Sequence, residues 1–149
     1  MRLNSLDEIL RYAIRKEADE AAFYQMAADR SNPGVRKAFL ELSEEEKGHQ
    51  RKLEGFDLKT IEQMELKKGQ DLGIGDAMSD IPFSSDMAYG DLLRMAIKNE
   101  EASHRLYAST AEIAPGPALK KLLLILAQEE LSHKEKLEKI YDDEILKEF

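Results

Sequence analysis

The stretch Leu42-Ser43-Glu44-Glu45-Glu46-Lys47-Gly48-His49 decides the fold of this chain. Glu46 and His49 stand three residues apart, so on a helix both side chains leave the same face. That face is otherwise apolar and follows the three-and-four spacing of a buried stripe, with Val35, Phe39, Leu42, Leu53 and Phe56. A carboxylate and an imidazole are costly to bury in such a stripe unless other groups pair with them. The rest of the sequence must therefore supply their partners.

The composition predicts one all-α domain over residues 1–149. Charged residues make up 35% of the chain, while eight glycines and four prolines are few, and this mixture suits long amphipathic helices. The net charge of −8 argues against nucleic acid as a partner, because phosphate binding needs a basic face. The sequence contains no cysteine, which excludes disulfides, iron–sulfur clusters, a rubredoxin-type iron centre and thiol catalysis within it. Without a signal-peptide pattern or an apolar run of ~20 residues, we expect a cytoplasmic protein that does not cross a membrane.

Periodicity and breakers predict four long helices. The first follows Ser5 as N-cap and ends before the break at residues 31–34, and Pro33 opens the second, which runs to about Gly55. The third begins near Tyr89 and ends before the break at residues 114–117, and the fourth runs to about Tyr141. The weaker pattern of residues 57–87 predicts a long crossover between the second and third helices, with a short helix possible over residues 58–68.

The two halves of the chain repeat each other. Ala13, Ile14, Glu17 and Tyr24 recur at the same offsets as Ala96, Ile97, Glu100 and Tyr107. The second and fourth helices match in the same way: Leu42, Glu46, His49 and Leu53 correspond to Leu126, Glu130, His133 and Leu137. The sequence therefore predicts a duplicated helical hairpin.

Counting along the helices places the polar residues of both hairpins at one height. Glu17 lies 13 residues before Arg30, and Glu46 lies 13 residues after Pro33. At a rise of ~1.5 Å per residue both glutamates stand ~20 Å from that turn, and the second hairpin agrees within one residue. We therefore expect four glutamates and two histidines to meet at one site: Glu17, Glu46, His49, Glu100, Glu130 and His133.

Such a site calls for a cation, because four carboxylates gathered in a core repel one another. Oxygen-rich ligands with two imidazoles suit iron or manganese, and zinc is a further candidate by affinity. A glutamate from each of two helices with Glu-x-x-His from each of the others is the ligand pattern of ferritin-like di-iron proteins. The third Glu-x-x-His pair, Glu101 and His104, falls off the core stripe and is predicted to be solvated.

The sequence resembles the rubrerythrin branch of the ferritin-like superfamily. The resemblance rests on Glu17 with Tyr24, on Glu46-Lys-Gly-His49, on Glu100 with Tyr107, and on Glu130-Leu-Ser-His133. It implies a ferritin-like four-helix bundle holding two iron ions. Glu46 and Glu130 would bridge or chelate both metals, Glu17 and Glu100 would be terminal ligands, and each histidine would hold one metal. Tyr24 and Tyr107 are expected to be core fillers or hydrogen-bond donors to the ligands.

The chain departs from the rubrerythrin pattern in two ways. Rubrerythrins carry a further carboxylate one turn after the glutamate of the third helix, where this chain has Ser103. Glu20 occupies the mirror position in the first hairpin, and we predict that it supplies the extra carboxylate from the other side. Full rubrerythrins also carry a rubredoxin domain, so electrons would come from a separate donor protein such as a rubredoxin.

Three functions fit this ligand set. The resemblance favours an oxidoreductase that reduces hydrogen peroxide or dioxygen at a di-iron site, as a homodimer. The alternative is oxidation and binding of ferrous iron for storage or delivery, for which we expect a very large particle. The third candidate function is that of an interaction module. Such a bundle would keep the ligand residues but fold without metal.

Overall fold

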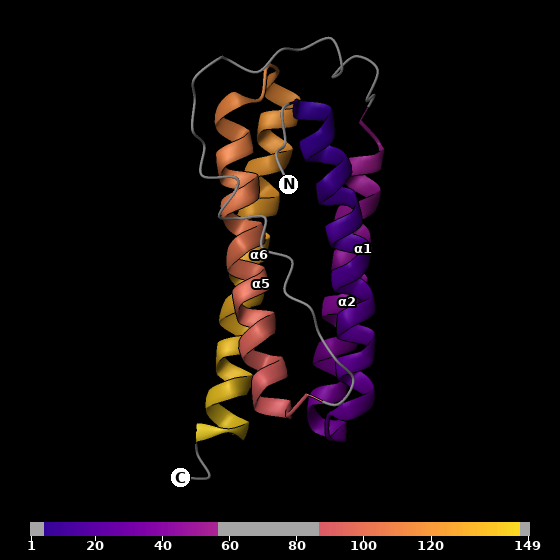
Figure 1. Cartoon of the computed structure of the whole chain (residues 1–149), viewed down its shortest axis with the longest axis vertical. Coiled ribbons are helices and arrows are strands. Elements are labelled where there is room, and N and C mark those ends of the chain that lie inside the picture. Colours follow the sequence, from indigo (N-terminus) through magenta and orange to yellow (C-terminus); the bar gives the residue numbers. More distant parts are fainter. Residues whose placement is uncertain (1–4, 57–86, 147–149) are drawn as a thin grey trace.

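Four long helices make up the part of the chain that the structure describes, which is residues 5–56 and 87–146 of a computed structural model. They are α1 (Leu6–Arg30), α2 (Pro33–Glu54), α5 (Tyr89–Ile113) and α6 (Pro117–Glu144), and these ranges contain no strand (Figure 1). The all-α prediction is confirmed. The predicted crossover and the short helix over residues 58–68 lie outside the described residues, apart from the last position of the crossover.

The helix ends follow the local chemistry of the sequence. The Ser5 hydroxyl accepts a hydrogen bond from the backbone N–H of Glu8, and the Asn32 side chain caps α2 by accepting from the N–H of Val35. Proline is the first residue of both α2 and α6, where its missing N–H costs nothing. The prediction for α6 was three residues too short. The helix continues to Glu144, whose carboxylate accepts a hydrogen bond from Asn32.

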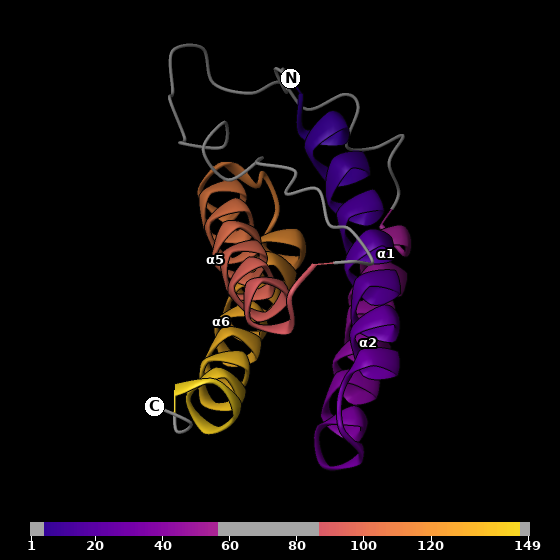
Figure 2. The same cartoon turned by 60° about the horizontal axis from the view of Figure 1, so that its bottom comes forward.

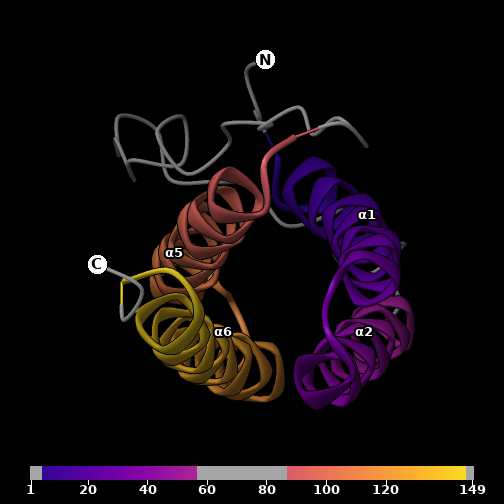
Figure 3. The same ribbon diagram turned by 90° about the horizontal axis from the view of Figure 1, so that it is seen from below.

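The helices form two antiparallel hairpins that lie side by side. Helix α1 packs along α2, and α5 packs along α6, whereas the hairpins meet along the narrower α1–α5 and α2–α6 seams (Figures 1 and 3). With the bottom of the bundle tilted forward, α1 with α2 and α5 with α6 stand as two separate pairs (Figure 2). In Figure 1, α2 ends at the top of the bundle and α5 begins at its bottom, which is the pseudo-twofold arrangement that the repeat requires.

Two apolar clusters hold the ends of the bundle and leave a polar layer between them. One cluster includes Leu10 and Leu123, and the other includes Tyr24 and Phe39. Each fully buried side chain of this size contributes roughly 1.5–3 kcal/mol to folding. The layer between them contains the buried polar residues Glu17, Glu20, Ser43, Glu46, His49, Glu100, Ser103, Glu130 and His133. Within the described ranges, no helix has the length and apolar character needed to cross a membrane.

Candidate metal centre

The polar layer contains two overlapping groups of metal-ligating atoms. Glu17, Glu46, His49 and Glu130 form one group, and Glu46, Glu100, Glu130 and His133 form the other. Within each group the ligand atoms lie within 4.8 Å of one another, which is close enough to surround one ion. The structure therefore brings together all six side chains that the sequence singled out, although their role as ligands stays a prediction. Glu46 and Glu130 belong to both groups, as expected of bridging residues.

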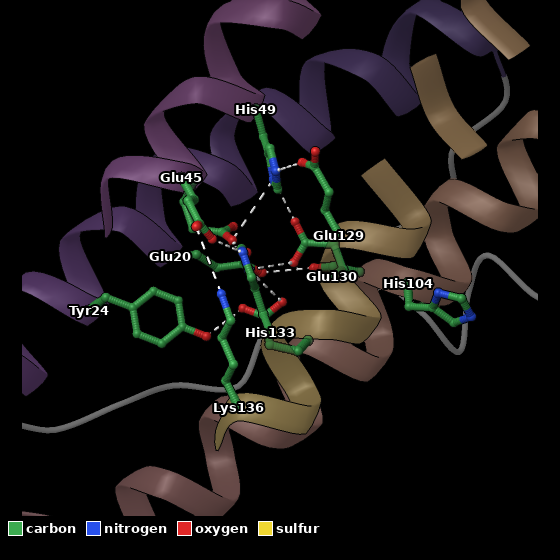
Figure 4. Close-up of polar contacts among 12 residues, drawn as sticks. Glu20, Tyr24, Glu45, His49, His104, Glu129, Glu130, His133 and Lys136 are labelled. Atoms are coloured by element: carbon green, nitrogen blue, oxygen red, sulfur yellow. Dashed lines mark hydrogen bonds and ion pairs between the residues drawn. The ribbon is translucent and has the colours of Figure 1, made fainter. Parts of the chain in front are cut away.

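The histidine of each hairpin contacts a glutamate of the other hairpin. His49 Nδ1 lies 2.8 Å from Glu130 Oε1 and 3.5 Å from Glu17 Oε2. By the same pattern, His133 Nδ1 lies 2.7 Å from Glu46 Oε1 and 3.6 Å from Glu100 Oε2. The two imidazole rings are nearly parallel, with centroids 5.6 Å apart (Figure 4). Both Nδ1 atoms therefore face the carboxylates, one in each group.

Burial and repulsion perturb the acid–base behaviour of these residues. The four shared and terminal glutamates are completely buried, at 0% exposure. Burial, followed by the charges of the neighbouring glutamates, raises the pKa of Glu46 and of Glu130 well above the usual value. For Glu17, burial would raise the pKa, but the close approach of Glu46 and His49 outweighs burial and lowers it. Burial opposes protonation of His49 and His133, but their contacts with Glu17 and Glu100 outweigh it and raise both pKa values.

The carboxylate oxygens of this layer that have no hydrogen-bond partner fit a pair of cations. Five carboxylate oxygens of the two groups are buried without a hydrogen-bond partner in the described part of the chain: Glu17 Oε2, both oxygens of Glu46, Glu100 Oε2 and Glu130 Oε2. Leaving one buried polar atom unpaired costs about 1–3 kcal/mol, and more where the group is charged. Metal ions at the centre of each group would satisfy these oxygens and cancel the repulsion. The layer thus has the chemistry of a dinuclear site for iron or manganese.

The two tyrosines hold the terminal glutamates. Tyr24 of α1 donates its hydroxyl hydrogen to Glu100 of α5, and Tyr107 of α5 donates to Glu17 of α1. All four side chains are buried, so each bond ties one hairpin to the other beside the site. Both tyrosines thus donate to carboxylates of the polar layer, and their role beside metal ligands stays a prediction. The other oxygen of each glutamate, Oε2, faces the histidine of its own group.

Sequence reasoning missed Glu45 and Glu129, which hold the outer faces of the histidines. His49 Nε2 contacts Glu129 of α6, and His133 Nε2 contacts Glu45 of α2. Glu45 stands on the surface of α2 with a side chain that is 45% exposed, and it still reaches His133 of the other hairpin. The signal was present in the repeat, since Glu-Glu-x-x-His occurs at both Glu45–His49 and Glu129–His133.

Glu45 and Glu129 also line an opening that leads to the histidines. A pocket of about 310 Å³ lies between α2 and α6 and is lined in matching pairs by Glu45 and Glu129, Gly48 and Ser132, His49 and His133, and Lys52 and Lys136. Figure 4 shows both histidine rings with the two glutamates beside them. Small molecules and ions therefore have a route to the imidazole edge of the site.

Replacing Glu45 and Glu129 by glutamine is expected to weaken metal binding about 10–100-fold, because an outer carboxylate fixes the orientation and tautomer of a ligating histidine. The measurement is competitive titration of Mn²⁺ or Zn²⁺ into the metal-free protein. Glu44→Gln serves as control, since Glu44 pairs with Lys47 on the surface. Equal affinities in the double variant and the control would show that these contacts do not orient the ligands.

Glu20 reaches the polar layer but belongs to neither metal group. Its Oε1 accepts a hydrogen bond from the Ser103 hydroxyl at 2.8 Å, while its Oε2 is buried without a hydrogen-bond partner in the described ranges. Burial raises the pKa of Glu20 to about 7 against the opposing charge of Lys16. The structure therefore places Glu20 directly beside Ser103, which stands where rubrerythrins have their extra carboxylate.

The prediction that Glu101 and His104 are solvated needs correction for His104. Its ring is half-buried, and Nδ1 lies 2.7 Å from the carbonyl oxygen of Ala127 on α6. Glu101 instead pairs with Arg105 on the surface. Neither residue is part of a metal group in the described chain, so their spacing on α5 has no ligand role there.

Two antiparallel hairpins around a buried layer of carboxylates and imidazoles define a ferritin-like protein of the di-iron carboxylate class. The chain belongs to the rubrerythrin family, whose family model matches residues 8–72 and 91–148. No curated protein matches it.

Two solved structures share the fold. One, from Thermotoga maritima and described as a ferritin-like diiron-carboxylate protein, is 20% identical with a TM-score of 0.73 and covers 95% of this chain and 97% of its own. The other, a hypothetical protein from Pyrococcus furiosus, is 26% identical with a TM-score of 0.70, and the match covers 93% of this chain and 89% of that one. Both support the ferritin-like four-helix bundle.

Proposed function

We propose that the protein holds two iron ions and reduces hydrogen peroxide or dioxygen at this pair. The observation that carries the proposal is the sharing of Glu46 and Glu130 by two overlapping donor groups, each completed by one histidine and one terminal glutamate. Glu46 and Glu130 would bridge the ions. Glu17 with His49 would complete one position, and Glu100 with His133 the other. Manganese or zinc could occupy the same donors.

Bound iron would supply the electrons and polarise the O–O bond of the oxidant. Reduction of one hydrogen peroxide to two water molecules consumes two electrons and two protons. A separate electron-donor protein such as a rubredoxin would restore the electrons, because this chain has no cysteine to build an iron–sulfur centre of its own. The pocket between α2 and α6 would admit the oxidant, and its size of about 310 Å³ suits a small molecule.

The residues of the chain would prepare the site before any oxidant arrives. Glu45 and Glu129 would hold each Nε2–H, which leaves the lone pair of Nδ1 directed at the metal. Tyr24 and Tyr107 would keep one oxygen of each terminal glutamate occupied. The apolar clusters above and below exclude water from the carboxylates, which strengthens their interaction with a bound cation.

Peroxide titration of the ferrous protein tests this function. One equivalent of hydrogen peroxide per iron pair should oxidise both irons within seconds, and a reduced rubredoxin should then restore the ferrous state over many cycles. The particle should be the size of a homodimer by size-exclusion chromatography. A very large particle that accumulates far more iron than one pair per chain would contradict the proposal in favour of storage.

A further inference from the structure

A lysine lies inside the bundle next to the polar layer. The Lys16 side chain is only 7% exposed, and its Nζ lies 3.3 Å from Glu20 Oε1, one helical turn along α1. Lysine is rarely buried to this degree unless it is paired. Lys16 directly precedes Glu17 in the chain, yet neither metal group includes it, and nothing in the proposed ligand set requires it.

Lys16 and Glu20 mark a break in the twofold pattern of the site. The repeat pairs Glu17 with Glu100 and Tyr24 with Tyr107, so by the same offset Lys16 corresponds to Asn99 and Glu20 to Ser103. Every contact described above for His49, His133, Tyr24 and Tyr107 has a twin in the other hairpin. The Lys16–Glu20 pair has none, because its counterparts carry no charge.

The two oxygens of Glu20 have different surroundings. Oε1 accepts from Ser103 and pairs with Lys16, so it is held from both α5 and α1. Oε2 is buried and has no hydrogen-bond partner in the described ranges. Ser103 stands three residues after Glu100 on the same face of α5, so its hydroxyl draws the Glu20 carboxylate to the side of Glu100.

We propose that Lys16 is a positioning residue for the metal pair: with Ser103 it holds Oε1 of Glu20, so that Oε2 becomes an extra donor to the metal position of Glu100 and His133. The two metal positions are therefore unequal. This inference rests on the proposed metal pair and adds to it a residue outside the ligand set.

The charge of Lys16 explains why a fifth carboxylate is tolerated there. Four ionised glutamates balance two divalent cations, so a further buried carboxylate without a partner would leave a net negative charge. Lys16 supplies the compensating positive charge within 3.3 Å of Glu20. The site thus gains a donor atom without gaining net charge, and only on one side.

The Mössbauer spectrum of the full chain loaded with ⁵⁷Fe²⁺ tests this inequality, because it resolves irons with different ligands. We expect two quadrupole doublets of equal area from the wild-type protein. The variant Lys16→Asn, Glu20→Ser copies the residues of α5 into α1, and its two doublets should merge into one. Two irons per chain with a single doublet in the wild-type protein would overturn the inference and leave the proposed function intact. Fewer than two irons per chain would overturn both.

Single variants isolate the role of Lys16. Lys16→Met should retain two irons and alter one doublet only, and Lys16→Arg should restore the wild-type spectrum because it keeps the cation. If Lys16→Met fails to fold, Ser103→Ala removes the other tether of Glu20 with a minimal change of volume and should also alter one doublet. A spectrum unchanged from wild type in the folded variant would show that Glu20 is not held in this way.

Discussion

Replacing both Glu46 and Glu130 by alanine is expected to lower the metal content from about two ions per chain to near zero. Each metal position would lose both shared carboxylates and keep only one glutamate and one histidine. Two protein donors are too few for a stable iron or manganese site. The loss should exceed the ~10–100-fold cost of removing an outer partner of a ligand. Elemental analysis after reconstitution with ferrous iron measures it.

Two exposed glutamates on the same helices provide the matched control. Glu44→Ala with Glu135→Ala removes the same number of carboxylates from α2 and α6, but from the solvent face. The control should keep both ions, and circular dichroism should show the same helix content in both double variants. If the Glu46 and Glu130 variant still bound two ions per chain, the bridging role of these residues would be wrong.

The sequence predicted most of the fold because the chain repeats itself. The Glu-x-x-His pairs, at Glu46 and at Glu130, fixed the register of two helices, and the equal distances to the turns fixed their height. The N-cap at Ser5 and the proline at Pro33 then set the boundaries of the first two helices within a few residues. Helix register and helix boundaries depend on residues close together in the sequence, so periodicity and capping residues predict them directly.

What the sequence did not show depends on contacts between the hairpins. Glu45 and Glu129 lie next to predicted ligands, but their pairing with the opposite histidine follows from how α2 faces α6. Lys16 resembles any lysine four residues from a glutamate on a helix surface, and only packing shows that it is buried. The half-buried ring of His104 is a similar case, since its partner is a backbone carbonyl on another helix. The type of a residue does not show whether its backbone carbonyl accepts a hydrogen bond from a distant side chain.

Metal removal is expected to lower the unfolding temperature of the protein by about 10–20 °C at neutral pH. Two ions present at 100 times their dissociation constants would each stabilise the fold by about 2.7 kcal/mol. For a chain of 149 residues, each kcal/mol corresponds to a shift of roughly 2–4 °C or slightly more. Thermal unfolding followed by circular dichroism, with Mn²⁺ or with a chelator, measures the difference.

The metal-free protein should lose stability as the pH rises. The pKa values of Glu46, Glu130, His49 and His133 are raised in the folded state. A group with a raised pKa stabilises the fold fully below its unfolded value and loses that contribution as the pH rises through its folded value. The same holds for Glu20, between the usual pKa of 4.5 and about 7. Among the buried groups of this layer in the described ranges, Glu17, whose pKa is lowered, contributes in the opposite direction.

Metal binding has the opposite pH dependence, because the ions must displace protons from the same carboxylates and imidazoles. The difference in unfolding temperature between the metal-bound and the metal-free protein should therefore grow steadily from pH 5 to pH 8. Metal-free stability that stayed level or rose over this range would show that the buried glutamates are not strained by one another. In that case the layer would be a satisfied polar network, and its carboxylates would have no need of a cation.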